Sequence, residues 1–123
     1  MEIVTDSHTF FWFLSDNPKL SIKAKKHIKE AEKVIVPSIV LMEILYLLEK
    51  NHLAYKFVDV LSELKIKRYL VYPLDLDVIA QTLSLDLNME MHDRIIVATA
   101  HIFNAFLISK DTSIRNTYPK TIW

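Results

Sequence analysis

The sequence predicts an α/β fold in which helices cover both faces of one parallel sheet. Short apolar runs alternate with longer segments whose apolar residues recur at helical spacing, in the order β-α-α-β-α-α-β-α-α-β-α-β. Runs such as residues 34–36 and 105–109 are mostly apolar rather than alternating, which is typical of strands covered on both faces. We therefore expect a three-layer α/β/α domain around a central parallel sheet of four to five strands.

Length and composition restrict the possible classes of protein. At 123 residues the chain is long enough for one domain and too short for two, so we expect residues 1–123 to form a single domain. It has no cysteine, which excludes disulfides, thiolate metal sites and a cysteine nucleophile. It has no glycine, which argues against glycine-rich nucleotide-binding loops. The formal net charge of zero argues against binding nucleic acid mainly by overall attraction.

The beginning of the chain does not resemble a signal peptide. Glu2 and Asp6 stand where a basic region and a long apolar core would be needed. The longest apolar stretch, residues 34–48, is too short to span a membrane and contains Pro37 and Glu43. We expect a cytoplasmic protein that does not enter a membrane.

The expected elements are read from apolar periodicity and from the residues that stop or start helices. Pro37 is well placed at the start of a helix, Pro73 ends a strand, and Asn104 can end a helix in a left-handed turn. The expected strands are residues 2–5, 34–36, 69–72, 105–109 and 121–123. The expected helices are residues 7–14, 19–33, 37 to about 51, about 54–67, 75–85 and 93–104, with one helical turn at 112–116. The helices near 37–51 and 54–67 could form a projecting hairpin.

Geometry predicts that two distant aspartates meet. A helix of about 11 residues and a strand of about 5 residues are both roughly 16 Å long. If the helix that begins at Asp93 packs back along the sheet, its start lies at the same edge as the end of the strand before Asp111. Ligands bind at that carboxyl edge in open α/β sheets.

The acidic residues at this edge also have ordinary structural interpretations. Asp6 and Asp111 follow strands and can cap helices or turns, and Asp93 lies in the first turn of a helix, where a carboxylate is favoured. Any one of them is therefore weak evidence. Three carboxylates at one edge are stronger evidence, because like charges repel and need a compensating cation.

Glu43 is the only charged side chain between Val34 and Leu48. An ionised group among leucine, isoleucine and methionine is costly unless it has a partner. The side chain could also lie on the outer face of its helix. It is nearly two turns into that helix, so spacing alone does not place it at the acidic edge.

Several carboxylates with few nitrogen ligands favour a hard cation such as Mg²⁺ or Mn²⁺. Such ions activate water and stabilise the leaving oxygen of a phosphodiester. A zinc site would need two or three nitrogen ligands at set spacing, and His8 and His92 do not provide them. We assign the other histidines to the surface or to packing. We assign the aromatic residues 10–13 to the core rather than to a base-stacking platform. We interpret the lysines of residues 23–29 as a solvated helix face, with phosphate contact as the alternative.

At this point the chain resembles PIN-domain nucleases of the toxin type found in VapBC-like toxin–antitoxin pairs. The resemblance covers essentially the whole chain. It is carried by Thr5–His8 with Phe11–Leu14, by Ser15–Ser21, by Pro37-Ser38 with Met42–Ile44, by His92–Ala100, and by Leu107–Asp111 with Lys120–Trp123. Each motif is short and degenerate, and the five in this order are specific.

The resemblance implies a Rossmann-like PIN fold and a metal-dependent endoribonuclease that uses Mg²⁺ or Mn²⁺. It implies that Asp6, Glu43, Asp93 and Asp111 are the catalytic and metal-binding acids, and so it places Glu43 at the acidic pocket. Ser7 and Ser109 match positions where such proteins carry a supporting hydroxyl. It also implies an RNA substrate, a cognate antitoxin protein as partner, and a homodimer.

The sequence departs from the family pattern at three places. His92 precedes Asp93 where the family often has proline or alanine, Asn104 stands where it often has glycine, and Ser109 where it often has threonine. These departures, with the neutral net charge, motivate an alternative: a PIN-like module that binds RNA or protein with little or no catalysis. A phospho-accepting receiver domain is a third hypothesis, weakened because Asp6 stands alone after the first strand. An apolar groove formed by Leu45, Leu48, Leu53 and Phe57 could seat an antitoxin segment.

Overall fold

The computed structural model describes all of residues 1–123 and contains one five-stranded parallel sheet. Its strands lie in the order β3-β2-β1-β4-β5. Their bounds are β1 (Glu2–Thr5), β2 (Lys33–Pro37), β3 (Tyr69–Tyr72), β4 (Phe106–Ile108) and β5 (Thr121–Ile122). β1 is the central strand, because Val4 pairs with Ile35 of β2 on one side and with Leu107 of β4 on the other. The expected parallel α/β architecture is confirmed.

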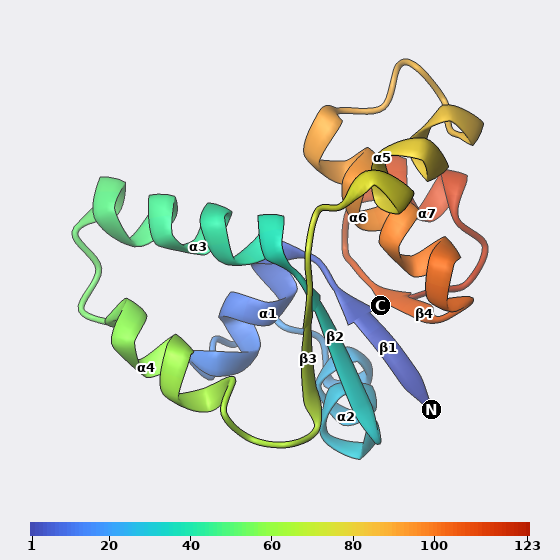
Figure 1. The fold of residues 1–123 in the computed structure, drawn as a ribbon. Coiled ribbons are helices and arrows are strands. Elements are labelled where there is room, and N and C mark those ends of the chain that lie inside the picture. Colours follow the sequence, from blue (N-terminus) through green and yellow to red (C-terminus); the bar gives the residue numbers. More distant parts are fainter.

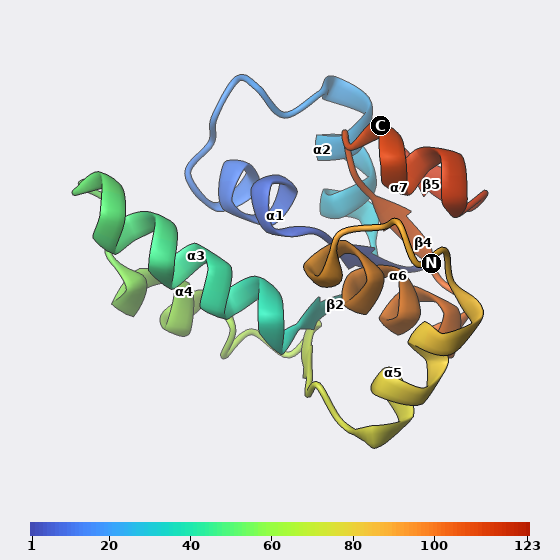
Figure 2. The ribbon, with the colours of Figure 1, turned by 90° about the horizontal axis from the view of Figure 1, so that it is seen from above.

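Helices cover both faces of the sheet. Figures 1 and 2 show α1 (Ser7–Leu14) and α2 (Ile22–Glu30) on one face, and α5 (Leu76–Gln81) and α6 (Met91–Phe103) on the other. A 3₁₀ helix, η1 (Thr82–Ser84), follows α5, and α7 (Thr112–Thr117) connects β4 to β5. No helix combines the length and the apolar composition that crossing a lipid bilayer requires.

Both faces of the two central strands are sealed from water. Ile3 and Val4 of β1 and Val34, Ile35 and Val36 of β2 have no exposed surface. Burying a branched apolar side chain of this size stabilises a fold by about 1.5–3 kcal/mol relative to leaving it exposed. The continuous apolar character of these strands is therefore explained by helices on both sides of the sheet.

The expected helical hairpin is formed by α3 (Ser38–Asn51) and α4 (Phe57–Glu63), which extend away from the sheet in Figure 1. The apolar groove expected on it is wrong in part. Leu48 belongs to the hydrophobic core with 8% of its surface exposed, and Phe57 packs against that core. Of the four expected groove residues only Leu53 is well exposed, and Leu45 is half-buried.

Several element boundaries differ from the sequence expectation. α6 begins at Met91 rather than Asp93, because Glu90 caps it by accepting a hydrogen bond from the Asp93 N–H. α2 begins later than residue 19, because the Ser21 hydroxyl caps it. α4 is shorter than residues 54–67, and the expected helix 75–85 divides into α5 and η1. Pro37 is the last residue of β2 and stands just before α3.

Non-glycine residues make every left-handed turn in this glycine-free chain. Asp16, His52 and Asn104 have φ values of 52°, 49° and 48°. Asn104 ends α6 in this conformation, as expected, and His52 ends α3. Asparagine, aspartate and histidine are enriched among the non-glycine residues found there, but each carries a steric cost that glycine does not.

We expect His52→Gly to raise the free energy of unfolding by about 0.5–1 kcal/mol, because glycine relieves the steric cost of a positive φ at the end of α3. The matched control is Glu49→Gly in the last turns of the same helix, where glycine should lower it by a similar amount. Urea unfolding followed by circular dichroism measures both. Equal destabilisation by the two substitutions would contradict the strain at His52.

Candidate active site at the carboxyl edge of the sheet

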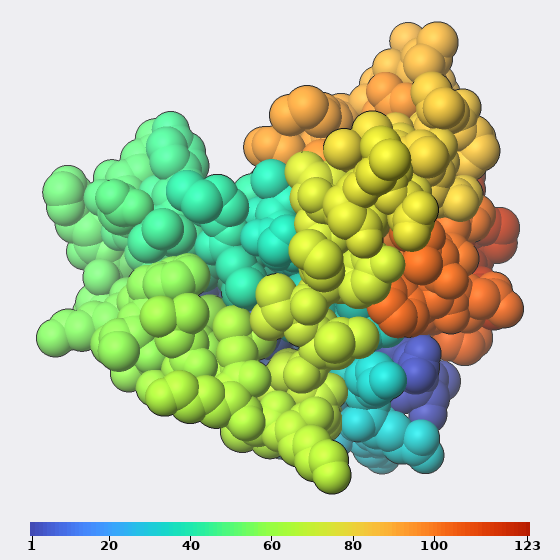
Figure 3. Space-filling model, viewed as in Figure 1, coloured from blue at the N-terminus to red at the C-terminus, as the bar shows by residue number.

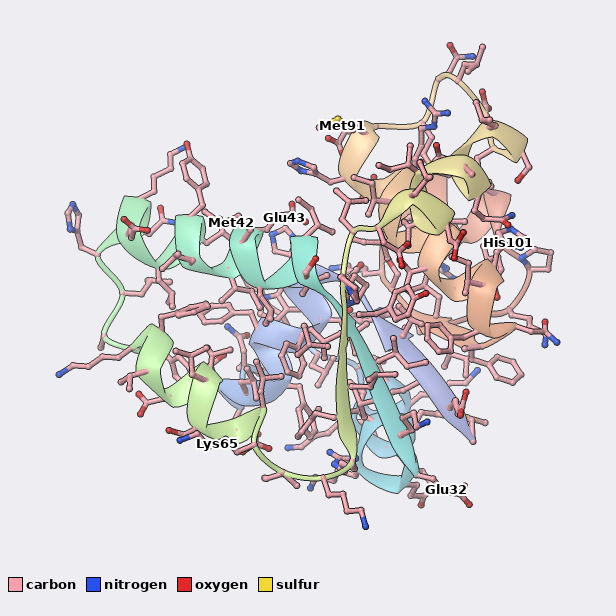
Figure 4. The ribbon with its side chains drawn as sticks, viewed as in Figure 1. Glu32, Met42, Glu43, Lys65, Met91 and His101 are labelled. Atoms are coloured by element: carbon pink, nitrogen blue, oxygen red, sulfur yellow. The ribbon has the colours of Figure 1, made fainter.

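A pocket of about 440 Å³ lies at the carboxyl edge of the sheet, where β1 and β4 end. Figure 3 shows the molecule hollowed between α3 and the segment that leads into α6, and Figure 4 places Glu43 and Met91 on the two sides of this notch. All four sequence-predicted acids line the pocket. Its lining residues are Asp6, Ser7, His8, Thr9, Trp12, Glu43, Asp93, Ile96, Lys110, Asp111 and Thr112.

Asp6 is buried and both of its carboxylate oxygens are engaged. Oδ1 caps α1 by accepting from the Thr9 N–H at 2.9 Å, and Oδ2 accepts from the hydroxyl of Ser109. The same Ser109 oxygen accepts from the Asp111 N–H at 3.1 Å. One buried hydroxyl therefore links the acid after β1 to the acid after β4, and it fixes their relative positions.

Asp111 also serves as a helix cap. Its Oδ1 accepts from the Ile114 N–H at 3.1 Å and begins α7, while its other oxygen makes no hydrogen bond within the protein. The capping interpretation and the pocket interpretation are both correct for Asp6 and Asp111. A residue directly after a parallel strand and before a helix satisfies both conditions at once.

Glu43 reaches the pocket because α3 starts at the carboxyl end of β2 and passes beside α1. The Ser7 hydroxyl donates to its Oε1 at 2.6 Å, and His92 Nδ1 lies 3.3 Å from its Oε2. Glu43 therefore joins α3 to the starts of α1 and α6. Sequence spacing could not show this position, which depends on the direction in which α3 leaves the sheet.

The surroundings of Asp93 disfavour its ionised form. Its pKa is raised from 3.8 to about 6, first by burial and then by the negative charges of Asp111, Glu90, Asp6 and Glu43. The only basic side chain within 4 Å of any of the four pocket acids is His92 beside Glu43. The pocket therefore holds excess negative charge, which favours a bound cation.

The donor set fits a hard divalent cation. Mg²⁺ and Mn²⁺ prefer carboxylate oxygen, and four carboxylates surround this pocket. No three Asp, Glu or His side chains are already arranged as ligands of one ion. In this structure hydrogen bonds from Ser7 and Ser109 hold Glu43 and Asp6. A bound ion would draw the four carboxylates closer together, and all four already line the same pocket.

Sequence analysis did not identify Glu90, Lys110 and Trp12 as residues of the site. Glu90 caps α6, and its Oε1 lies 3.7 Å from His92 Nδ1, but glutamate is not a preferred capping residue and gave no signal. Lys110 lines the pocket and brings a positive charge to it. Trp12 also lines the pocket, whereas its neighbour Phe10 is fully buried in the core. Which of several consecutive aromatics faces a pocket depends on the rotation of the helix.

Comparison with known proteins assigns this architecture to a family. The family model described as the PIN domain matches residues 3–119. The chain belongs to the PIN domain family. This membership agrees with the resemblance found in the sequence motifs and contradicts the receiver-domain hypothesis. No curated protein matches the chain.

Solved structures of toxins and toxin–antitoxin complexes share the fold at low sequence identity. A toxin–antitoxin complex from Klebsiella pneumoniae matches with a TM-score of 0.72 and 17% identity, covering 98% of this chain and 96% of that one. VapBC2 from Rickettsia felis, bound to a DNA fragment from its promoter, matches with a TM-score of 0.69 and 18% identity, covering 99% and 96%. VapC20 from Mycobacterium tuberculosis, described as a sarcin–ricin-loop-cleaving toxin, matches with a TM-score of 0.65 and 18% identity, covering 93% of each chain.

We expect Asp93→Asn to raise the free energy of unfolding of the metal-free protein at pH 7 by about 1 kcal/mol. A shift of about two pKa units corresponds to about 3 kcal/mol, and partial exposure of the side chain reduces the effect. Because the folded pKa lies above the unfolded value, the parent loses this stability as pH rises from about 4 to about 6. Urea unfolding in EDTA between pH 4 and pH 8 measures the difference.

The matched control is Asp77→Asn, which removes the same charge from the first turn of α5, away from the pocket. Loss of a favourable helix-dipole interaction should leave its stability unchanged or slightly lower. If Asp93→Asn behaves like this control, repulsion within the pocket is not significant.

Proposed function

We propose that this PIN domain is a metal-dependent endoribonuclease that acts as the toxin of a toxin–antitoxin pair. The observation that supports it most is the convergence of Asp6, Glu43, Asp93 and Asp111 on one pocket with an excess of negative charge. Carboxylates alone repel a polyanion, so an acidic pocket in an RNA-cleaving enzyme requires a cation between protein and phosphate.

In this proposal the four acids hold Mg²⁺ or Mn²⁺, which supplies activation of water and stabilisation of the leaving oxygen. The hydroxyls of Ser7 and Ser109 orient the carboxylates of Glu43 and Asp6 by hydrogen bonds. Lys110 at the pocket offers the positive charge that attracts a phosphate group. The chain's contribution is therefore to gather negative charge in a fixed place and to position the phosphodiester beside it.

A protein partner is part of the same proposal, because the solved structures that share the fold include toxin–antitoxin complexes. The hairpin exposes Leu53, Val58 and Leu61, with exposed fractions of 43%, 59% and 48%, which suits an apolar antitoxin segment. A homodimer would cover a second apolar surface around α5 and η1, where Leu76 and Leu83 are 77% and 83% exposed.

We expect the purified protein to bind Mn²⁺ and to cut RNA in its presence, and Asp111→Asn to lose both properties. Asparagine keeps the oxygen that caps α7 and removes only the charge, so the fold should persist. Calorimetric titration of Mn²⁺ and electrophoresis of single-stranded RNA measure the two properties, with Asp77→Asn as a control that retains them. RNA cleavage by Asp111→Asn at the parent rate would overturn the assignment of this acid.

We expect Ser109→Ala to bind Mn²⁺ roughly tenfold more weakly while the fold persists. The substitution removes the hydroxyl that donates to Asp6 and accepts from the Asp111 N–H, so the buried Asp6 carboxylate and the partly buried Asp111 N–H each lose one partner. Calorimetry gives the affinity and thermal unfolding gives the stability. Unchanged Mn²⁺ affinity with reduced stability would restrict Ser109 to a structural role.

A second candidate function is a PIN-like module that binds RNA or protein without cleavage. It is supported by the contacts already made to Glu43 by Ser7 and His92, and by the absence of a ready-made set of metal ligands. The two functions differ in their need for metal. Partner or RNA binding that is unchanged in EDTA, with no cleavage in Mn²⁺, would favour the module.

A further inference from the structure

We propose that Trp12 stacks against an unpaired base of the bound RNA next to the cleaved phosphodiester. This inference rests on the proposed endoribonuclease function. Trp12 and His8 line the same pocket as the four acids, one helical turn apart on α1, and their ring centroids are 5.6 Å apart. Trp123 adds a third ring, 6.1 Å from Trp12. Trp123 is not part of the pocket lining, and we call the two lining rings, His8 and Trp12, the aromatic rim of the pocket.

The burial of α1 separates core residues from pocket residues. Phe10 is fully buried and makes an edge contact with Tyr69 in the core. Trp12 is only half-buried and His8 is exposed. The buried part of Trp12 packs against the core and fixes the ring, while its exposed part lies beside a polar pocket. A ring fixed in this way can stack with little further loss of conformational entropy.

The charges around the site explain why stacking is needed. The pocket is acidic and the chain has a formal net charge of zero, so overall attraction does not hold RNA. Stacking of a base on an aromatic ring does not depend on charge and is worth about a five- to hundredfold change in affinity per base. Lys19 is exposed with its Nζ 6.0 Å from the centroid of the Trp12 ring, where it can meet the phosphate of the stacked nucleotide.

The same geometry restricts the substrate. A base inside a duplex has both faces covered by its neighbours, so it cannot stack on a protein side chain without leaving the helix. The aromatic rim therefore favours an RNA strand with at least one unpaired base beside the phosphodiester at the acids. The rim, unlike the acidic pocket, distinguishes unpaired from paired RNA.

The first test compares cleavage kinetics of a single-stranded RNA oligonucleotide by the parent and by three variants in Mn²⁺. Trp12→Leu should raise KM roughly tenfold with kcat nearly unchanged, and Trp12→Phe should restore most of the loss because it keeps a stacking ring. The matched control is Phe106→Leu. Phe106 is half-buried with Lys120 Nζ 5.5 Å from its ring, but it begins β4 at the opposite edge of the sheet.

Equal KM values for Trp12→Leu and Phe106→Leu would overturn the stacking role, while cleavage by the parent would leave the nuclease function standing. A rise in KM that Trp12→Phe does not correct would also overturn it, because loss of packing rather than loss of stacking would then explain the effect. Circular dichroism of each variant confirms that the fold is retained.

The second test does not depend on cleavage. The chain has two tryptophans, so Trp123→Phe leaves Trp12 as the only one. Its fluorescence should be quenched by the single-stranded oligonucleotide, and roughly tenfold more oligonucleotide should be needed once it is annealed to its complement. No quenching, or equal quenching by both forms, would overturn the inference. If the parent cuts no RNA, the nuclease function fails, and quenching alone then decides whether the rim binds unpaired bases.

Discussion

Repulsion among like charges is the constraint on which the site depends. Asp93 shows it most directly, because burial and four neighbouring carboxylates raise its pKa to about 6. A fold gains nothing in stability from such an arrangement and loses some, since each ionised neighbour opposes the next. The surrounding structure must therefore hold the acids together, and it does so with hydroxyl hydrogen bonds, helix caps and a central strand whose last three residues are fully buried.

The central position of β1 makes this possible. Its neighbours are β2 and β4, so the segments that leave all three strands emerge at one edge: Asp6 after β1, α3 with Glu43 after β2, and Asp111 after β4. Ser109 then connects two of these exits through a hydrogen bond that spans 103 positions of sequence. Contacts between distant parts of the chain therefore set the separation of Asp6 and Asp111, which no single helix or strand can do.

Apolar periodicity and the direction of the chain made part of the structure predictable from the sequence. Prediction failed where a position depends on how a helix is oriented or rotated in the folded protein. Continuous apolar strands indicated the parallel sheet, and equal lengths of helix and strand indicated the meeting of Asp93 and Asp111, both confirmed by the structure. Glu43 was placed only by family resemblance, because the path of α3 is a tertiary property. The start of α6 was misplaced, since Glu90 is an unusual cap. The exposed face of Trp12 was hidden among four consecutive aromatics, because the rotation of α1 decides which ring faces the pocket.

Asp6 and Asp111 are both helix caps and pocket acids, and this double role affects which substitutions the fold tolerates. Asp6 and Asp111 each commit one oxygen to the first turn of a helix, and that hydrogen bond needs an acceptor rather than a charge. At Asp111, whose other oxygen makes no hydrogen bond within the protein, asparagine satisfies the helix and removes only the charge. At Asp6 the second oxygen accepts from the Ser109 hydroxyl, so asparagine would also replace that acceptor with an N–H donor. At Asp93 stability and charge are opposed, because the ionised side chain is itself the destabilising group. Substitution by a neutral residue would therefore be favoured by stability at Asp93, whereas a cation bound in the pocket would favour the charged side chain.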